Sequence, residues 1–417
     1  MFTPQIKVFF LHFCMIIIAG ILLLYGYSTT TINGDIVIYQ KYANNFWYGS
    51  PDASMLPKEY PILSLAPMLL PLITGASMYN ETFNFIFLVL VFGIYLFLFY
   101  LRSKSSAFVF LIYILVGSIG LVLSRLDLII GAIILLSLFE ANHKRFISAY
   151  ILLALGAMFK IVPILLVLPL FLEEQRFYQH SKIIKRFYGL GVFAVVCFVI
   201  FLASLAIDVN ATFSPLKYGI ERPIQIESIP ASIIHSLSRL NFIQTCSFID
   251  FGSLNIGMLR EGVCNPPNND LWNLMTQKIT LILILTLICG LMYMVKLYKA
   301  RRITLSQMYI IVLLLILSTS KVFSPQYMLW ILPLIAYVHG FDKKIFSITA
   351  ILSVLTTIVF PILYSGNTLI SISSIQLEDG IFVRNLVFIV FAISYIFNIF
   401  NIRESQAHPQ SNFKQNN

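Results

Sequence analysis

Long apolar runs separated by short polar loops extend along this chain from its first residues to about residue 400. A membrane-spanning helix needs about 20 consecutive apolar residues. Runs of this length predict transmembrane helices over 8–28, 82–101, 187–207, 276–297, 345–364 and 384–401. Shorter runs are long enough to cross a membrane if they tilt or lie where the bilayer is thin; they cover 107–124, 127–141, 306–320 and 326–340. This pattern predicts an all-α polytopic membrane protein.

Two segments do not fit a simple crossing. Residues 61–78 are apolar but contain three prolines and follow a polar loop, and residues 146–172 form either one long helix or two short helices broken at "KIVP". Basic residues concentrate in the cytoplasmic loops of membrane proteins. In this chain the basic residues gather in the cytoplasmic loops if 61–78 lies on the outer face without crossing and 146–172 turns back at Lys160. We therefore expect about twelve crossings with both termini in the cytoplasm.

This topology describes one transmembrane domain over 1–401, with outer loops 29–81 and 208–275 and a short disordered cytoplasmic tail over 402–417. The first loop contains "IVIYQKYANNFW". Its apolar residues predict an amphipathic helix on the membrane surface with Asp35 as its N-cap; they are Ile36, Tyr39, Ala43, Phe46 and Trp47. Cys246 and Cys264 share the second loop, and the sequence leaves open whether they form a disulfide.

Composition also indicates an integral membrane protein. It is 59% hydrophobic and only 11% charged, whereas soluble domains carry about 25% charged residues. The first apolar run lacks a cleavage site of small residues, so we expect a retained helix in a multi-pass protein of the plasma (inner) membrane. The net charge of +10 reflects basic loops, and we expect membrane lipid rather than nucleic acid as the partner. Metal-type Cys/His spacing does not occur, so we expect no metal site.

Charged residues at membrane depth gather at the outer side of this topology. They follow helix ends or lie in the outer loops; they are Asp35, Arg125, Lys160, Arg222 and Lys321. Charges within a membrane are rare and usually face a cavity. The four cations can bind a phosphate and stabilise charge on a departing phosphate, and the carboxylate can take a proton from an attacking hydroxyl. The pattern favours an outward-opening cavity that binds a lipid-linked phosphate.

Simpler interpretations of the same charges remain open. Lys321, at the end of a helix, can extend its ammonium to the lipid headgroups. Arg125 and Asp127 are close in sequence and can neutralise each other. Arg222 and Glu227 can form an ordinary ion pair in a solvated loop.

Six short motifs occur in a fixed order along residues 1–400. They are "NGD" (33–35), "YP" (60–61), "SRLD" (124–127), "MFKIVP" (158–163), "RPIQIES" (222–228) and "SKVFSPQYMLW" (320–330). Together they resemble the polyprenyl-phosphate-sugar-dependent glycosyltransferases of the GT-C superfamily, and glycosyltransferase family 87 most closely. The elements around Lys160 and Lys321 also resemble the first mannosyltransferase of GPI-anchor assembly.

The resemblance implies a GT-C-like helical bundle that transfers a hexose, usually mannose, from a polyprenyl-phosphate sugar donor to a lipid-linked or exported acceptor. Transfer would invert the anomeric carbon on the non-cytoplasmic face. By this resemblance Asp35 is the catalytic base, and the donor phosphate binds Arg125, Lys160, Arg222 and Lys321. The supporting positions would be Tyr60, Asp127, Glu227, Gln326 and Tyr327. Many GT-C enzymes have two acidic residues one apart in the first loop. This chain has only Gly34-Asp35 there, so we expect neither a metal ion nor a cofactor.

Two other functions fit a membrane protein with these charges. One is a transporter or flippase for lipid-linked glycans, and the other is a polymerase or ligase for them. Transporters often contain repeated halves. The chain shows no visible internal repeat and its charged residues gather on one side, which favours an enzyme. The sequence does not identify the sugar, the acceptor, the linkage or the oligomeric state.

Overall fold

The computed structural model describes residues 4–29, 34–49, 56–260, 262–264, 270–364 and 376–397. Among these residues, six helical segments are long and apolar enough to cross a membrane. They confirm that the six long predicted spans are helical. They comprise α1 (Pro4–Thr29), α4 (Tyr79–Leu101), α9 (Ile183–Ile207), α12 (Asp270–Lys299), α15 (Lys343–Thr357) continued by η6 (Ile358–Leu363), and α16 (Leu377–Ile396). The end of the last predicted span, 398–401, and the tail over 402–417 lie outside the described residues.

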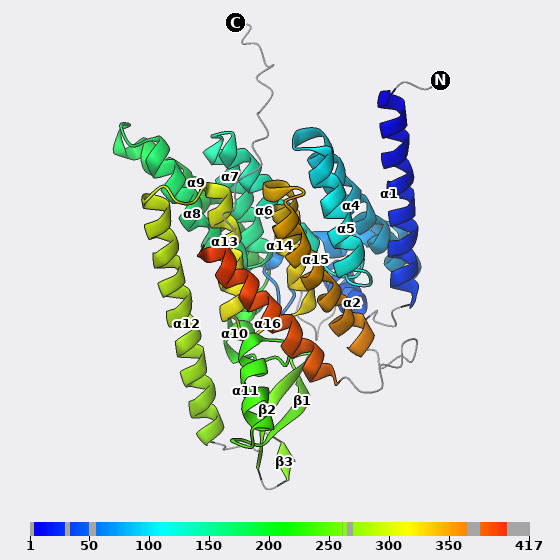
Figure 1. Cartoon of the computed structure of the whole chain (residues 1–417), viewed down its shortest axis with the longest axis vertical. Helices are drawn as coiled ribbons and strands as arrows, with labels where there is room; N and C mark the ends of the chain where they lie inside the picture. Colours follow the sequence, from blue (N-terminus) through cyan, green and yellow to red (C-terminus); the bar gives the residue numbers. More distant parts are fainter. Residues whose placement is uncertain are drawn as a thin grey trace, which may run out of the picture.

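Five shorter helices lie where the shorter crossings and the first half of 146–172 were predicted, although the helix predicted over 107–124 ends at Gly117 and residues 118–124 are not helical. They are α5 (Lys104–Gly117), α6 (Asp127–Asn142), α7 (Phe146–Phe159), α13 (Leu305–Thr319) and α14 (Met328–His339), the last preceded by the 3-10 turn η5 (Pro325–Tyr327). In Figure 1, α5, α6 and α14 lie between α1 on one side and α12 on the other. Every residue of α14 is buried, whereas only 6% of the apolar window of α9 or α12 is buried. The core of the bundle therefore surrounds α13 and α14.

The two ambiguous segments both fold as interrupted helices. Residues 61–78 form short turns; they are η1 (Ile62–Ser64), α3 (Leu65–Leu69), η2 (Leu70–Thr74) and η3 (Ala76–Met78). The segment 146–172 breaks after Phe159, as predicted, and resumes as η4 (Val162–Leu166) and α8 (Val167–Phe177). Pro163 explains the break, because a proline ring clashes with the carbonyl four residues earlier and supplies no N–H donor.

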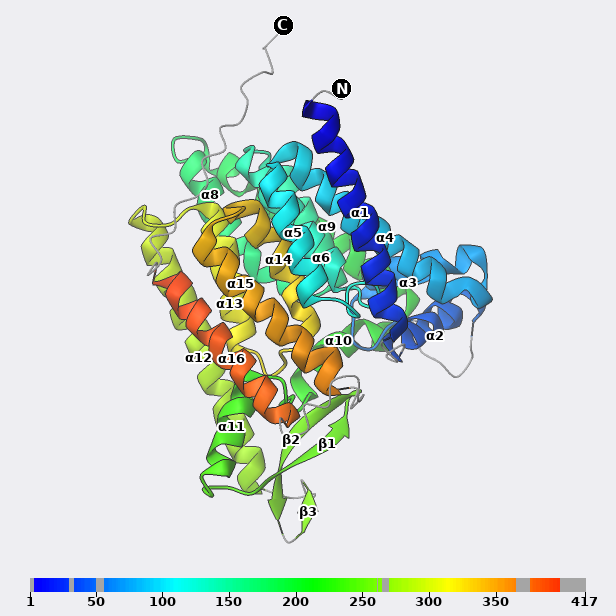
Figure 2. The ribbon, with the colours of Figure 1, turned by 45° about the vertical axis from the view of Figure 1, so that its right-hand side comes forward.

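The first outer loop contains the predicted helix, α2 (Gly34–Tyr48), which lies beside α3 at the edge of the molecule (Figure 2). Asp35 lies within its first turn, not at the N-cap as expected. Ile36, Tyr39 and Ala43 are buried against the rest of the protein, whereas Trp47 is 67% exposed. The apolar face of α2 therefore divides between the protein core and the surface.

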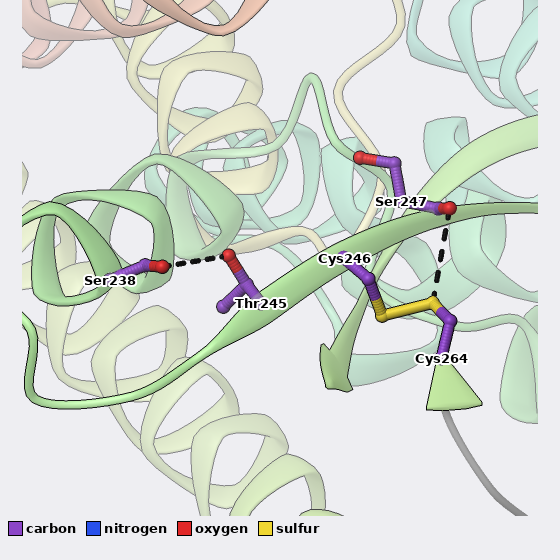
Figure 3. The surroundings of a disulfide bond; sticks show 5 residues. All are labelled: Ser238, Thr245, Cys246, Ser247 and Cys264. Atoms are coloured by element: carbon purple, nitrogen blue, oxygen red, sulfur yellow. Dashed lines mark hydrogen bonds between the residues drawn. A yellow bond between two sulfur atoms is a disulfide. The ribbon is translucent and has the colours of Figure 1, made fainter. Parts of the chain in front are cut away.

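The second outer loop folds into α10 (Val209–Glu221), α11 (Ile229–Arg239) and a small antiparallel sheet that the sequence pattern did not predict. Its strands are β1 (Thr245–Asp250), β2 (Ser253–Arg260) and β3 (Val263–Cys264), in the order β1-β2-β3. Cys246 of β1 and Cys264 of β3 form a disulfide (Figure 3). Thr245 Oγ1 also donates a hydrogen bond to Ser238 Oγ of α11 over 3.0 Å. The sheet is therefore fastened both across its strands and to the neighbouring helix.

Candidate functional site

A cavity of about 650 Å³ lies where the bundle meets α2, α10 and the turn between β1 and β2. Its lining includes every site residue expected from the sequence except Asp127; they are Asp35, Tyr60, Arg125, Lys160, Arg222, Glu227, Lys321, Gln326 and Tyr327. These residues come from segments almost 300 positions apart in the chain. The fold therefore brings the charges predicted for one outer site to one cavity.

Asp35 and Arg125 form an ion pair on the cavity wall. Asp35 lies in the first turn of α2, and Arg125 lies in the turn just before α6. Their side chains are 27% and 14% exposed, so both groups are partly shielded from solvent. The Arg125 Nε atom is buried and has no hydrogen-bond partner among the described residues. Arg125 and Asp127, which the sequence suggested as partners, form no direct ion pair with each other.

Asp127 instead pairs with Lys160. Lys160 has an extended backbone between α7 and η4, and its Nζ atom donates to Asp127 Oδ1 over 2.7 Å. The same carboxylate oxygen accepts a 2.7 Å hydrogen bond from Trp330 Nε1. Asp127 is completely buried at the start of α6. A buried charge is strongly unfavourable unless it is paired and hydrogen-bonded, so this pair fixes the ends of α6, α7 and α14 relative to one another.

Three aromatic rings surround the Lys160 ammonium. Its Nζ atom lies 4.6 Å from the ring centre of Tyr327, 4.8 Å from that of Trp330 and 5.4 Å from that of Tyr60. A cation over an aromatic face is attracted by the negative charge of the ring. The rings and Asp127 therefore hold the ammonium in place beside the cavity.

Lys321 lies in the loop after α13 and reaches α10. Its Nζ atom donates to the carbonyl oxygens of Ile220 and Arg222 over 2.9 and 2.8 Å. These carbonyls belong to the C-terminal end of α10, where carbonyls lack helical partners and a cation is favourable. Burial lowers the pKa of Lys321, and the nearby Arg222 lowers it further. The Lys321 ammonium is thus bound to the protein, which the interpretation of Lys321 as a lysine at the headgroups did not include.

Arg222 itself follows α10 and lines the cavity. Its guanidinium lies 5.6 Å from the ring centre of Tyr218. Its Nε atom is buried without a hydrogen-bond partner among the described residues. Buried donors are almost always hydrogen-bonded in proteins, so the unpaired Nε atoms show that the described residues do not use all the donors of Arg222 and Arg125.

Glu227 lies in the segment between α10 and α11 and is 3% exposed. Its side chain accepts a hydrogen bond from Gln225 Nε2. Burial raises the pKa of Glu227 to about 7, although Arg384, Tyr364 and Arg222 act in the opposite direction. Glu227 therefore titrates near neutral pH on the cavity wall, where the sequence suggested an ordinary ion pair with Arg222.

Arg384 of α16 fastens the loops on either side of the cavity. It is 1% exposed, and its Nη2 atom donates to the carbonyl oxygens of Glu227 and Phe323 over 2.6 and 3.2 Å. Its neighbour Asn385 donates to the carbonyl oxygens of Glu227 and Ser228, each over 3.1 Å. These bonds hold the segment 222–228 against the loop 320–324.

The tip of the β1–β2 hairpin completes the cavity. Phe251 and Gly252 form its two-residue turn with φ values of 50° and 65°, a conformation typical of tight antiparallel hairpins. The hydroxyl of Tyr218 in α10 donates to the Phe251 carbonyl over 2.8 Å. The backbone N–H of Ile226 donates to Leu254 O over 3.0 Å. The sheet thus forms part of the cavity wall but contributes no charged side chain to it.

Several residues of the site were not predicted. Trp330 lies inside a quoted motif, but nothing in the motif indicates that its ring N–H would reach Asp127. Arg384 is a charge inside the long apolar run "IFVRNLVFIV", and such a charge is a signal of an internal site in membrane proteins. Glu59 lines the cavity and accepts a 2.7 Å hydrogen bond from the Tyr42 hydroxyl; its partner on α2 could not be inferred from sequence spacing.

Comparison with known proteins adds no family assignment. The sequence matches no known protein-family model, and no curated protein matches it significantly. The resemblance to GT-C glycosyltransferases therefore stays a prediction that rests on the six motifs. Among the described residues no group of three or more His, Cys, Asp or Glu side chains could hold a metal ion, and metal independence likewise stays a prediction.

Proposed function

We propose that this protein is an integral membrane glycosyltransferase that moves a hexose from a polyprenyl-phosphate sugar to a lipid-linked or exported acceptor. Mannose is the hexose that we propose. The observation that carries the proposal is the convergence of Asp35, Arg125, Lys160, Arg222 and Lys321 on one cavity. In the proposed topology of about twelve crossings, this cavity opens to the non-cytoplasmic side of the plasma membrane. A single anionic group bound there would be within reach of several cations.

The phosphate of the sugar donor would bind the cations whose N–H groups are not all hydrogen-bonded within the protein. Arg125 and Arg222 each have a buried Nε atom without a partner among the described residues. An ammonium has three N–H donors, and Lys321 uses two of them on carbonyls of α10. Guanidinium and ammonium groups form strong charge-assisted hydrogen bonds with phosphate oxygens. Lys160, held by Asp127, would contribute mainly fixed positive charge.

In the proposed reaction, the acceptor hydroxyl oxygen attacks the anomeric carbon of the sugar and forms the new glycosidic bond. The bond from that carbon to the phosphate oxygen breaks, and the polyprenyl phosphate leaves with the electron pair. Asp35 takes the proton of the hydroxyl. A bound phosphate would compete with Asp35 for the Arg125 guanidinium. This competition would free the Asp35 carboxylate to act as the base. The cations stabilise the charge that develops on the leaving phosphate.

The experiment that tests this proposal uses the purified full chain in proteoliposomes with radiolabelled polyprenyl-phosphate mannose and a set of glycolipid acceptors. Formation of a labelled product with a new glycosidic bond supports transfer. Movement of intact donor between leaflets without product would overturn it in favour of a flippase. The same assay with a lipid-linked oligosaccharide donor distinguishes a polymerase or ligase, which would transfer a whole glycan rather than one hexose.

A further inference from the structure

A second cavity lies far from the candidate site, where the ends of α6, α8 and α12 meet the start of α13. Its volume is about 660 Å³, and its charged and aromatic lining comprises Lys144, Glu173, Arg176, Phe177, Tyr298, Arg301 and Arg302. In Figure 1 the C-terminal ends of α8 and α12 lie at the opposite end of the bundle from the β-sheet. It shares no lining residue with the candidate site, and the proposed transfer reaction does not use it.

Positive charge exceeds negative charge around this second cavity. Glu173 is the one carboxylate among the described lining residues, and it already accepts hydrogen bonds from Lys144 Nζ over 2.6 Å and from the Tyr298 hydroxyl. The Arg176 guanidinium lies 5.5 Å from the Tyr298 ring centre. Arg301 and Arg302 form no ion pair with any described carboxylate. Two arginines of the cavity lining thus have no acidic partner among the described residues.

The backbone at Arg301 adds an independent observation. After α12 ends, the N–H groups of Arg301 and Arg302 bond to the carbonyls of Tyr298 and Leu297 over 2.9 and 3.0 Å. Arg301 has a φ of 57°, the conformation in which glycine is favoured after a helix end. An arginine at this position carries a backbone cost that glycine would avoid. A role for its side chain in the adjoining cavity explains why an arginine occupies it.

We propose that this second cavity binds a phosphate group, carried either by the headgroup of an anionic phospholipid or by a soluble phosphate or diphosphate. Arg301 and Arg302 would bind the phosphate oxygens through paired N–H donors, and Arg176 and Lys144 would add positive charge. Basic pockets between helix ends suit anionic headgroups. Phe177, 50% exposed at the rim, offers an apolar contact for the rest of such a lipid.

The test uses the purified full chain in nanodiscs and the double variant Arg301→Gly/Arg302→Gln. One arm measures binding of radiolabelled pyrophosphate in zwitterionic nanodiscs. The other arm measures, by native mass spectrometry, phosphatidylglycerol retained from mixed nanodiscs. The matched control is Lys343→Gln/Lys344→Gln, because these lysines are exposed at the start of α15 and do not line the cavity.

We expect saturable binding in at least one arm, weakened about tenfold or more in the double variant and unchanged in the control. Retention of lipid alone identifies a headgroup site, and binding of pyrophosphate alone identifies a soluble ligand. The single variant Arg301→Gly should bind more weakly while its unliganded melting temperature stays equal or rises, which separates binding from folding. Binding in neither arm, or equal losses in the double variant and the control, would overturn the proposal.

Discussion

The two cavities have nearly the same volume and are both basic, but their cations differ in exposure and in their acidic partners. In the candidate site, the Lys160 and Asp127 side chains are 15% and 0% exposed, and the cation is enclosed by rings and a carboxylate. In the second cavity, the paired Lys144 side chain is 42% exposed, and the two arginines have no described acidic partner. A buried charge is strongly unfavourable without a partner, whereas an exposed charge is solvated by water and remains available to bind a ligand. The first cavity is therefore suited to a fixed chemical geometry and the second to reversible ion binding.

The largest effect should come from the proposed base. In Asp35→Asn the amide cannot accept the proton of the acceptor hydroxyl, and loss of a general base typically costs 10²- to 10⁴-fold in rate. We expect the initial rate of sugar transfer to fall about 1,000-fold, measured with purified protein in proteoliposomes. Transfer near the wild-type rate would rule out Asp35 as the base.

The control for this variant is Asp208→Asn, the same change at the start of α10. Asp208 caps this helix by accepting a 2.9 Å hydrogen bond from the Ala211 N–H, and asparagine is an equally good cap. It does not line the cavity. Transfer by Asp208→Asn should match wild type, and an equal loss in both variants would mean that the assay reports folding rather than chemistry.

The second prediction compares one ion pair from each cavity. Asp127→Ala leaves Lys160 and the Trp330 N–H without their acceptor, and breaking a buried pair by removing one partner costs about 3–5 kcal/mol. Lys144→Gln removes an exposed partner, and such pairs contribute about 1 kcal/mol or less. Reversible unfolding in mixed micelles measures both free energies of unfolding. Equal losses in the two variants would contradict the distinction between a fixed and an open cavity.

Glu227 makes the stability of the candidate site pH-dependent. Its pKa is raised to about 7 in the folded protein from an ordinary value of 4.5 because it is buried. Between these pH values the folded chain binds more protons than the unfolded chain, so its stability falls as the pH rises. The shift corresponds to about 3 kcal/mol. Glu227→Gln should remove this dependence, as followed by melting temperature from pH 4 to 8; a variant whose curve still falls like wild type would contradict the assignment.

The sequence predicted the local features of the fold well. Each long span consists mainly of apolar residues, so its hydropathy alone locates it, and Pro163 marks the break after Phe159. The gathering of Asp35, Arg125, Lys160, Arg222 and Lys321 followed from loop charges because these set which helix ends share a face.

Pairings within the site could not be predicted in the same way. Arg125 and Asp127 are two positions apart, yet each binds a partner from a distant segment, because packing of α2, α6 and α7 decides which groups meet. Lys321 was expected to bind a phosphate or to reach the lipid headgroups, and the sequence did not indicate that its ammonium would bind carbonyls at the end of α10. The small sheet was not predicted, although apolar residues alternate with polar residues or glycine over 253–258, a pattern typical of a strand.

The central claim is that cations of the candidate site hold a lipid-linked phosphate, and binding of polyprenyl phosphate tests it most directly. Arg222→Gln removes a cavity guanidinium, whereas Lys217→Gln removes a lysine of the preceding helix α10 whose side chain is 74% exposed. Equilibrium binding of a radiolabelled polyprenyl phosphate to the purified chain in nanodiscs should be saturable, about tenfold weaker in Arg222→Gln and unchanged in Lys217→Gln. Saturable binding that is equal in all three proteins, or no binding at all, would contradict the account.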